Sequence, residues 1–230
     1  METTNQTLAE MARATPAATR VFLRHRLDFC CGGKRTLSEA CERAGLDAAA
    51  IVREIQAEET RPDDDIWWEE RSSTELVDHI ERRYHAGLRR DLPALLAAAR
   101  RVERVHAGKP DVPVGLANLL ADLAEELEQH MRKEEQVLFP MLRQGARGEP
   151  VYMPIRMLES EHDGHGQMLA RVRALTSDLA VPANACATWS ALYQGLEALE
   201  ADLMQHVHLE NNVLFARAVQ AEPRHSRAGS

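Results

Sequence analysis

The sequence contains two copies of a short pattern in which a histidine is followed four residues later by a glutamate and then by Val-Leu-Phe. The copies occupy residues 130–139 and 206–215. Residues four apart on a helix lie on one face, about 6 Å apart, so each imidazole and carboxylate could hold one metal ion or bridge two. A single such pair is usually a solvated surface contact, but two copies with the same apolar tail predict a buried helix face that carries metal ligands. The pairs are His130 with Glu134 and His206 with Glu210.

Two further histidines extend this repeat. His85 precedes His130 by 45 residues, and His162 precedes His206 by 44. The near-equal offsets predict an internal twofold repeat, in which one helix carries a histidine and the next carries the His-x-x-x-Glu pattern. Such a site fits two divalent ions, each with about three protein ligands, bridging carboxylates and open positions. The predicted metal ligands are His85, His130, Glu134, His162, His206 and Glu210.

Carboxylates near these histidines could orient the rings by accepting the ring N–H that does not face a metal. Three of them lie four residues before a predicted ligand, and a fourth lies next to His162. The alternative is that all four are ordinary charged helix positions. His165, three residues after His162, stays near the site but is not included among the ligands. The predicted orienting residues are Glu81, Glu126, Asp202 and Glu161.

Long amphipathic helices must carry this site. They begin after a capping box at residues 72–75 and are separated by short Gly- and Pro-containing breaks. Four such helices with short connections predict an all-α fold built on an antiparallel up-down four-helix bundle, and Pro93 is expected to kink the first helix or to mark an irregular turn. The predicted helices span residues 74–106, 114–144, 151–178 and 185–220.

Four shorter helical signals precede the bundle, with a capping box at Thr36–Glu39 and a stop at Gly45. They predict a small N-terminal helical domain. The acidic stretch at residues 62–65 is the best candidate for a linker. The predicted division is an N-terminal domain at 1–60, a linker at 61–73, the bundle at 74–220 and a flexible tail at 221–230.

A glycine-rich loop at residues 28–33 contains the adjacent cysteines Cys30 and Cys31. Adjacent cysteines cannot close an unstrained disulfide, so the thiols could act as a redox pair, as soft metal ligands or as a docking contact. The alternative is that at least one of them packs beneath the loop as a small apolar residue. Cys41 and Cys186 stand at helical positions and are expected to be buried structural residues.

The composition excludes several classes of function. Lys plus Arg number 28 and Asp plus Glu number 36, and a net charge of −8 without a long basic run argues against nucleic acid as a partner. No apolar run is long enough for a membrane span, and the N-terminus has no secretory signal pattern. Four cysteines in a chain of 230 residues do not resemble a disulfide framework. A reduced cytoplasmic location is therefore expected.

The six predicted ligands resemble those of the hemerythrin-like HHE cation-binding domain, a di-iron bundle. Ordinary hemerythrins carry a second histidine four residues into the third-helix motif and an aspartate five residues into the fourth, where this sequence has Gly166 and Asn211. This loss argues against reversible oxygen carriage and favours a more open and labile centre. The ferritin-like bundle ranks lower, because only residues 159–162 match its Glu-x-x-His pattern.

The variant with four histidines and two glutamates, combined with the Cys-Cys loop, is similar to the RIC (repair of iron centres) family, which has an N-terminal Cys-Cys domain of the ScdA type. The resemblance extends over nearly the whole chain, including residues 102–107, 134–140 and 159–163. It implies a non-haem di-iron centre with oxo and carboxylate bridges, held by the six residues. It also implies that Cys30 and Cys31 relay iron or electrons or contact the damaged client.

Three functions compete for this sequence. The first is a stress-response protein that donates iron to iron–sulfur clusters damaged by nitric oxide or peroxide, with the damaged proteins as partners and a homodimer as an open alternative. The second is a di-iron reductase of nitric oxide or peroxide, which open coordination positions would permit. The third is an oxygen or redox sensor, which the missing fifth histidine disfavours. The cysteine pair favours the first function, and whether the protein is an enzyme stays open.

Overall fold

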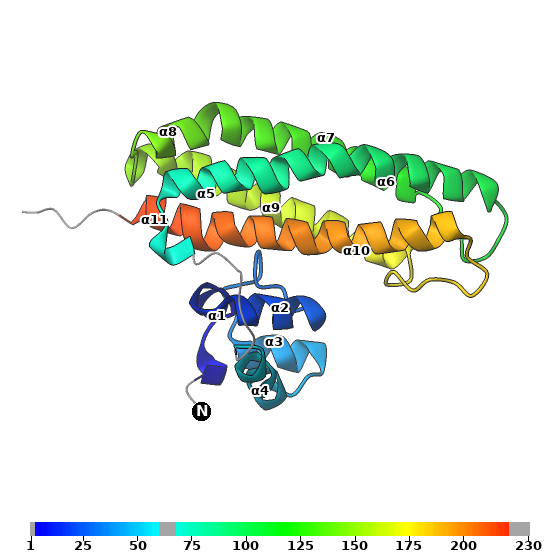
Figure 1. Cartoon of the computed structure of the whole chain (residues 1–230), viewed down its shortest axis with the longest axis horizontal. Helices are drawn as coiled ribbons and strands as arrows, with labels where there is room; N and C mark the ends of the chain where they lie inside the picture. The colour runs from blue at the N-terminus through cyan, green and yellow to red at the C-terminus, as the bar shows by residue number, and fades with distance from the viewer. Residues whose placement is uncertain (1–2, 60–67, 221–230) are drawn as a thin grey trace, which may run out of the picture.

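Four long helical segments lie side by side and antiparallel in the computed structural model, which describes residues 3–59 and 68–220 (Figure 1). Three of the segments change their winding along their length. The predicted all-α fold with a four-helix bundle is confirmed, and the segment ends lie within a few residues of the predicted ones. The segments are α5–η3–α6 (Ser73–His79, Ile80–His85, Ala86–Val105), α7–η4–α8 (Leu116–Lys133, Glu134–Leu138, Phe139–Arg143), α9 (Glu149–Leu175) and α10–η5–α11 (Ala187–His208, Leu209–Phe215, Ala216–Val219).

Helix starts follow the local sequence signals. The Ser72 hydroxyl accepts the backbone N–H of Glu75, whose carboxylate accepts the Ser72 N–H, so the predicted capping box opens the first segment. Helix α6 then continues without interruption through Pro93, where an irregular turn was one of the two expectations. The irregular turns lie instead in the three π-helical stretches η3, η4 and η5.

Two apolar clusters fill the bundle and leave a polar layer between them. One cluster includes Leu123, Leu127 and Leu203, and the other includes Ile80, Leu138 and Leu214. All of these side chains are at most 2% exposed, so water is excluded on both sides of the layer. Leu127 and Leu138 bracket the first His-x-x-x-Glu pattern along the chain, and the predicted ligands lie in the polar layer.

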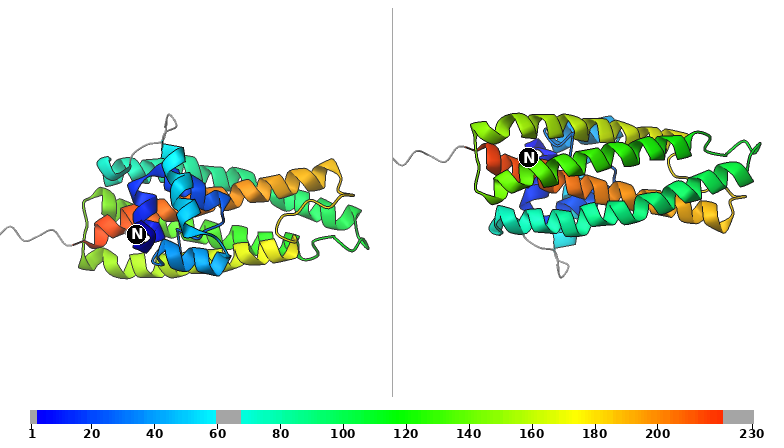
Figure 2. Two further views of the ribbon diagram at one scale, coloured as in Figure 1. Left: turned by 90° about the horizontal axis from the view of Figure 1, so that it is seen from below. Right: turned by 90° about the horizontal axis from the view of Figure 1, so that it is seen from above.

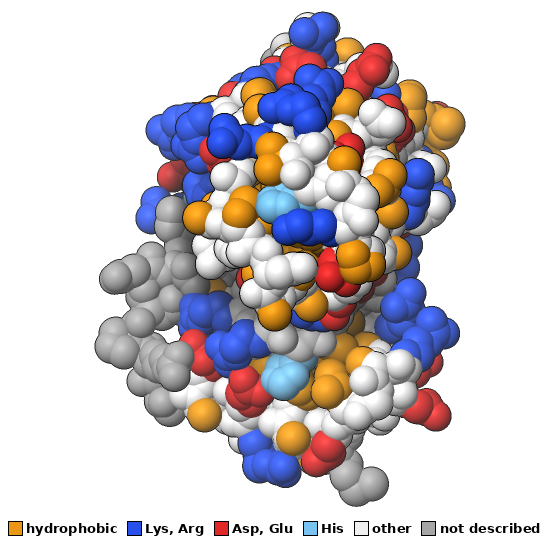
Figure 3. Space-filling model, turned by 90° about the vertical axis from the view of Figure 1, so that its right-hand side faces the viewer, with side chains coloured by type: hydrophobic (Ala, Val, Ile, Leu, Met, Phe, Trp, Pro, Cys, Tyr) orange, Lys and Arg blue, Asp and Glu red, His pale blue; other side chains and the backbone are white. Residues whose placement is uncertain are grey.

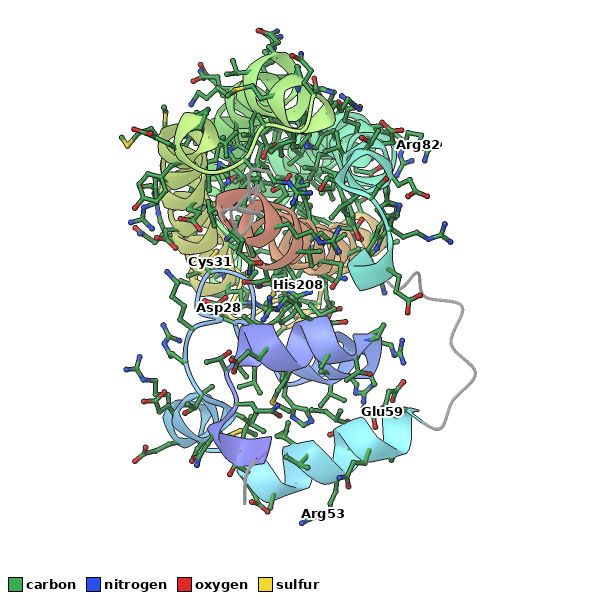
Figure 4. All side chains as sticks on the ribbon, turned by 90° about the vertical axis from the view of Figure 1, so that its left-hand side faces the viewer. Asp28, Cys31, Arg53, Glu59, Arg82 and His208 are labelled. Carbon is green, nitrogen blue, oxygen red and sulfur yellow. The ribbon has the colours of Figure 1, made fainter. Side chains whose placement is uncertain are left out.

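Shorter helices near the N-terminus form a layer against one side of the bundle (Figures 1 and 4). An isolated β-bridge between Thr7 and Thr36 ties two of their starts together, and Phe22 is fully buried in their own apolar cluster. The first half of the predicted linker, residues 61–67, and the whole of the predicted tail at 221–230 lie outside the described residues. The elements of this layer are η1 (Thr3–Asn5), α1 (Leu8–Ala14), α2 (Pro16–Arg24), α3 (Leu37–Ala44) and α4 (Ala48–Glu59). The short η2 (Trp68–Glu70) belongs to the bundle, where Trp68 packs against the apolar cluster that includes Leu138.

The loop between α2 and α3 docks the layer of N-terminal helices onto α10 and η5. Figure 2 shows from two sides how this layer lies across the bundle. The Phe29 ring meets the ring of His208 edge to face at 5.4 Å, and Nδ2 of Asn212 donates to the Phe29 carbonyl at 3.0 Å. Arg26 forms an ion pair with Asp178. Among the described residues, no helix is long and apolar enough to cross a membrane.

Candidate metal centre

π-helical turns bring several predicted ligands to one level of the bundle. His85 ends η3, Glu134 begins η4 and Glu210 is the second residue of η5. A π turn winds more slowly than an α-helix and is frequent at functional sites. The remaining ligands come from regular helix: His130 from α7, His162 from α9 and His206 from α10.

The structure brings all six predicted ligands together as two groups of four that share both glutamates. In each group the possible ligand atoms lie within 4.8 Å of one another. All six side chains are at most 2% exposed, which is rare for ionisable residues unless they are paired or bind a metal. The groups are His85, Glu134, His206 and Glu210, and His130, Glu134, His162 and Glu210.

Hydrogen bonds from neighbouring segments orient two of the rings through carboxylates. Nδ1 of His85 donates to Oε1 of Glu135 at 2.8 Å, and Nδ1 of His130 donates to Oε2 of Glu161 at 2.9 Å. Glu135 is held by Arg89 at 2.8 Å, and Glu161 is held by Lys133 at 2.6 Å. A carboxylate can only accept here, so the proton is on Nδ1 and Nε2 presents a lone pair.

The ring of His162 is oriented by an amide, since its Nδ1 lies 2.8 Å from Oδ1 of Asn211. Nδ1 of His206 is buried and has no hydrogen-bond partner among the described side chains and backbone. The two groups therefore differ in how firmly their histidines are held. Burial lowers the pKa of His85 to about 4 and also lowers the pKa of His130, so these rings are neutral at pH 7. Neutral imidazole is the form that binds a metal.

Lone pairs then face one another across the centre. Nε2 of His85 lies 3.3 Å from Oε2 of Glu134, and Nε2 of His130 lies 3.4 Å from the same oxygen. Nε2 of His130 and Nε2 of His162 are 2.9 Å apart, although both rings carry their proton on Nδ1. Acceptor atoms this close without a proton between them repel each other. A cation placed among them would turn the repulsion into coordination, so the donor set fits metal ions.

Glu134 is fully buried, and both of its oxygens lack a hydrogen-bond partner among the described residues. An ionised carboxylate in such a place costs several kcal/mol unless a cation compensates it. Burial, followed by the charge of Glu210, raises the pKa of Glu134 well above its usual range. Without a metal, this environment favours the protonated form of Glu134, and a bound cation would replace that proton.

Glu210 directs one oxygen toward each group. Oε1 lies 2.8 Å from Nε2 of His206, and Oε2 lies 3.2 Å from Nε2 of His162. Burial opposes its ionisation, but the neighbouring imidazoles of His206 and His162 hold the pKa of Glu210 well below its usual range. A carboxylate with one oxygen near each group has the geometry of a bridging ligand.

Three of the four predicted orienting residues lie elsewhere. Glu81 binds Arg143 at 2.8 Å, Asp202 binds Arg83 at 2.7 Å, and Glu126 is exposed. The physical reason is that Nε2 points into the bundle, so Nδ1 points across to a neighbouring segment and not back along its own helix. Of the four, only Glu161 orients a ring, that of His130.

Sequence reasoning missed Glu135 and Asn211, although a signal for them exists. Each directly follows a bridging glutamate, so they occupy the same position of the internal repeat. His165 is 3% exposed, and its ring lies 5.0 Å from that of His130, but it belongs to neither group of ligand atoms. Burial lowers the pKa of His165 to about 3.

The Cys-Cys loop reaches the bundle beside one of the ligands, as Figure 4 shows from the labelled Asp28 and Cys31. The Cys31 thiol donates to the backbone carbonyl of His162 at 3.4 Å. The two sulfurs are 3.7 Å apart, and the Cys30 thiol donates to Oδ1 of Asp28 at 3.3 Å. The pKa of the Cys30 thiol is raised well above its usual range, first by its contact with Cys31, then by burial and by the charge of Asp28. These residues form a third group of possible metal ligands.

A cavity of about 930 Å³ opens beside this loop, between the N-terminal layer and the bundle. Cys30 and Cys31 line it from the loop side, and Gly166 and Met204 line it from the bundle side. Cys30 is buried and Cys31 is half-buried, and both are free thiols. The pair is therefore reachable from outside, one helix away from the metal ligands.

Comparison with known proteins finds two matching regions in the chain. Residues 76–218 match the model of the hemerythrin HHE cation binding domain, and residues 4–59 match an N-terminal domain of unknown function called ScdA_N. The chain is 46% identical over 222 residues to proteins named iron–sulfur cluster repair protein YtfE from Yersinia pseudotuberculosis (strain IP 31758) and Yersinia pestis (strain Pestoides F). The match covers 96% of this chain and all of each relative.

Proposed function

The chain belongs to the hemerythrin HHE cation-binding family and to the iron–sulfur cluster repair proteins, and from this membership we propose that it repairs damaged iron–sulfur clusters by donating iron held in its bundle. The observation that carries the proposal is the pair of four-residue groups joined by two shared glutamates. Its clients are proteins whose clusters nitrosative or oxidative stress has damaged.

Two iron ions are the cargo that this site fits. Each group offers two imidazole nitrogens and the oxygens of two carboxylates, a donor set that suits iron. The shared carboxylates support a pair of ions because each has nitrogen neighbours from both groups. Imidazole and carboxylate ligands exchange with protons and other donors, which suits iron that is to be given away.

The residues around one of the two ligand groups support release of iron from that group. His130 and His162 form the group beside the Cys-Cys loop, since Cys31 contacts the His162 backbone. Their rings are oriented by Glu161, which is partly exposed, and by the neutral Asn211. We propose that iron leaves from this group and that Cys30 and Cys31 relay it, because thiolates exchange for imidazole nitrogens without a change of redox state.

Transfer of labelled iron tests the proposal. Protein loaded with ⁵⁷Fe is incubated with an iron–sulfur enzyme whose cluster nitric oxide has damaged, and the label in the recovered enzyme is measured together with its activity. We expect label to appear in the rebuilt cluster in proportion to recovered activity. Recovery of activity with unlabelled iron only would contradict donation from the bundle.

Replacement of both loop cysteines tests whether they pass iron to the client or help to hold it in the protein. Cys30→Ser with Cys31→Ser should slow repair while the iron content stays near that of the parent protein. Cys41→Ser is the matched control, because Cys41 is also buried but lies in α3. Loss of iron from the double variant would mean that the loop and the bundle form one site.

Reduction of nitric oxide or peroxide is the second candidate function, and an apolar groove favours it. A cavity of about 460 Å³ between α6 and α10 is lined by Tyr84 and Leu88, which flank His85, and by small residues such as Gly87 and Gly195. Small apolar molecules such as diatomic gases could follow this groove toward the ligands. Nitrous oxide formed by reduced, iron-loaded protein would reveal turnover, and Gly195→Leu should slow it. Binding of nitric oxide and formation of a homodimer remain predictions.

A further inference from the structure

A cysteine and a buried histidine meet at the end of the bundle away from the metal centre. Cys186 precedes His206 by 20 residues on one helix, which places them about 30 Å apart. Its thiol was expected to be buried, but it is exposed because Cys186 is the N-cap of α10 and not an interior helix residue. This end of the bundle faces the viewer in Figure 3.

The histidine approaches the sulfur from inside the bundle. Nε2 of His106 lies 3.2 Å from Sγ of Cys186, and His106 is buried, with 7% of the residue exposed. The imidazole packs against Trp189 with ring centroids 5.0 Å apart, and Trp189 is itself fully buried. The His106 backbone N–H donates to Val102 at 3.0 Å and ends α6. A rigid support therefore holds a base against an exposed thiol.

The start of α10 stabilises negative charge on the same sulfur. Helix α10 has 22 residues, so its first amides carry the positive end of a full helix dipole. The backbone amide of Trp189 is the largest influence and lowers the pKa of the Cys186 thiol. Burial opposes it, and the backbone amide of Thr188 adds to the lowering. Burial and Asp47 raise the pKa of Cys41. The same chain thus contains a thiol supported as thiolate and a thiol kept protonated.

We propose that Cys186 and His106 form a reactive thiol pair that exchanges with small disulfides, the oxidised forms of low-molecular-weight thiols. Nε2 of His106 takes the proton from Sγ, and the thiolate attacks one sulfur of the disulfide. A new S–S bond forms between Cys186 and that sulfur while the old S–S bond breaks. The second sulfur leaves with the bonding electron pair and takes the proton from His106. The products are a mixed disulfide on Cys186 and one free small thiol.

This modification site is independent of the iron centre and of the Cys-Cys loop. Cys186 is exposed at the surface, so a mixed disulfide can form there without unfolding the bundle. The apolar cluster that contains Leu192, Leu196 and Leu203 separates it from the ligands. Stress that oxidises the small-thiol pool would mark the protein at this end while the metal centre stays intact.

Thiol kinetics on the full-length, iron-loaded protein test the pair. The probe is 5,5′-dithiobis(2-nitrobenzoic acid), and the reference is the same protein unfolded in urea, where each cysteine reacts at its intrinsic rate. We expect a fast phase of one thiol per chain in the folded protein, about tenfold faster than the reference, because a lowered thiol pKa raises the thiolate fraction at neutral pH and a base lies beside the sulfur. Cys186→Ser should abolish the fast phase and leave the iron content unchanged. Cys41→Ser should leave the fast phase intact.

His106→Gln tests the role of the imidazole. It keeps a polar group near the sulfur but removes the base, so the fast phase should slow about tenfold. Thermal unfolding checks that this variant folds. If His106→Gln does not fold, the parent protein is exposed briefly to glutathione disulfide and its peptides are analysed by mass spectrometry. We expect Cys186 to be the first cysteine that is modified. A Cys186 rate no faster than in urea, an unchanged rate in folded His106→Gln, or first modification at another cysteine would each overturn the proposal.

Discussion

The Cys31 thiol donates a hydrogen bond to the backbone carbonyl of His162 at 3.4 Å, and the imidazole of the same His162 faces the metal centre. One residue of α9 is therefore shared between the N-terminal loop and the ligand set. A displacement of the loop changes the support of that helix turn, and a displacement of His162 changes the environment of the thiol. This contact links the two parts of the molecule that the proposed repair requires.

Replacement of either bridging glutamate should reduce iron binding. Glu134→Leu or Glu210→Leu removes an anionic ligand from both groups and leaves imidazole lone pairs without a shared oxygen. The iron content, measured by plasma mass spectrometry, should fall from two ions per chain to one or fewer. Glu126→Leu is the matched control, because Glu126 lies one helical turn before His130 but is exposed. Two ions retained in both bridging variants would rule out the shared-carboxylate arrangement.

Loss of an orienting carboxylate should weaken iron binding without abolishing it. Glu161 accepts the Nδ1 hydrogen of His130, and this bond, followed by that to Lys133, lowers the pKa of Glu161 to about 2. Glu161→Gln keeps an acceptor but removes the charge, so iron affinity should fall about tenfold or more, as orienting partners of metal ligands typically contribute. Competition with a chelator measures the affinity. Asp202→Asn serves as the control, since Asp202 pairs with Arg83, and an equal loss in that variant would argue against a specific role for Glu161.

Sequence spacing predicted that the six proposed ligands lie together, but it did not predict the hydrogen-bond partners of their rings. His130 and Glu134 share a helix, so the four-residue interval predicted their common face, and the repeat offsets located His85 and His162. The bonds from His85 to Glu135 and from His162 to Asn211 cross between segments. Packing, and not spacing along one helix, decides such bonds.

The π-helical stretches and Cys186 were missed for a related reason. Apolar periodicity over a long window is compatible with a single widened turn, so η4 and η5 looked like continuous α-helix. The predicted fourth helix began at 185, which put Cys186 inside it, whereas α10 begins at Ala187. The predicted start was two residues too early, so Cys186 was expected to be buried although it is the exposed N-cap. Helix ends are the least certain part of a sequence-based assignment.

The metal-free protein should lose stability as the pH falls from about 6.5 to about 4. Burial lowers the pKa of His85 and of His208 to about 4 and that of His165 to about 3, whereas an unfolded histidine has a pKa of about 6.5. The unfolded chain then binds more protons in this range, so the stabilising contribution is complete above pH 6.5 and is lost on acidification. Each such imidazole contributes a slope of up to about 1.4 kcal/mol per pH unit. Thermal unfolding at pH 7.5, 6 and 5 measures the effect, and His165→Phe should flatten it. Equal stability at the three values would contradict neutral buried imidazoles.

Substitution of two adjacent asparagines on η5 should show whether support of the metal ligands and docking of the N-terminal layer are separate properties. Asn211 accepts the ring hydrogen of His162, and Asn212 donates to the Phe29 carbonyl. Asn211→Ala should lower iron affinity about tenfold, because it frees the ring, while the N-terminal layer stays protected. Asn212→Ala should raise amide hydrogen exchange in residues 26–33 and slow iron transfer to a damaged cluster, while two ions stay bound. Chelator competition and exchange mass spectrometry on both variants give the comparison, and each variant is the control for the other. If Asn212→Ala loses iron as readily as Asn211→Ala, the loop is part of the iron-holding site and not a separate relay.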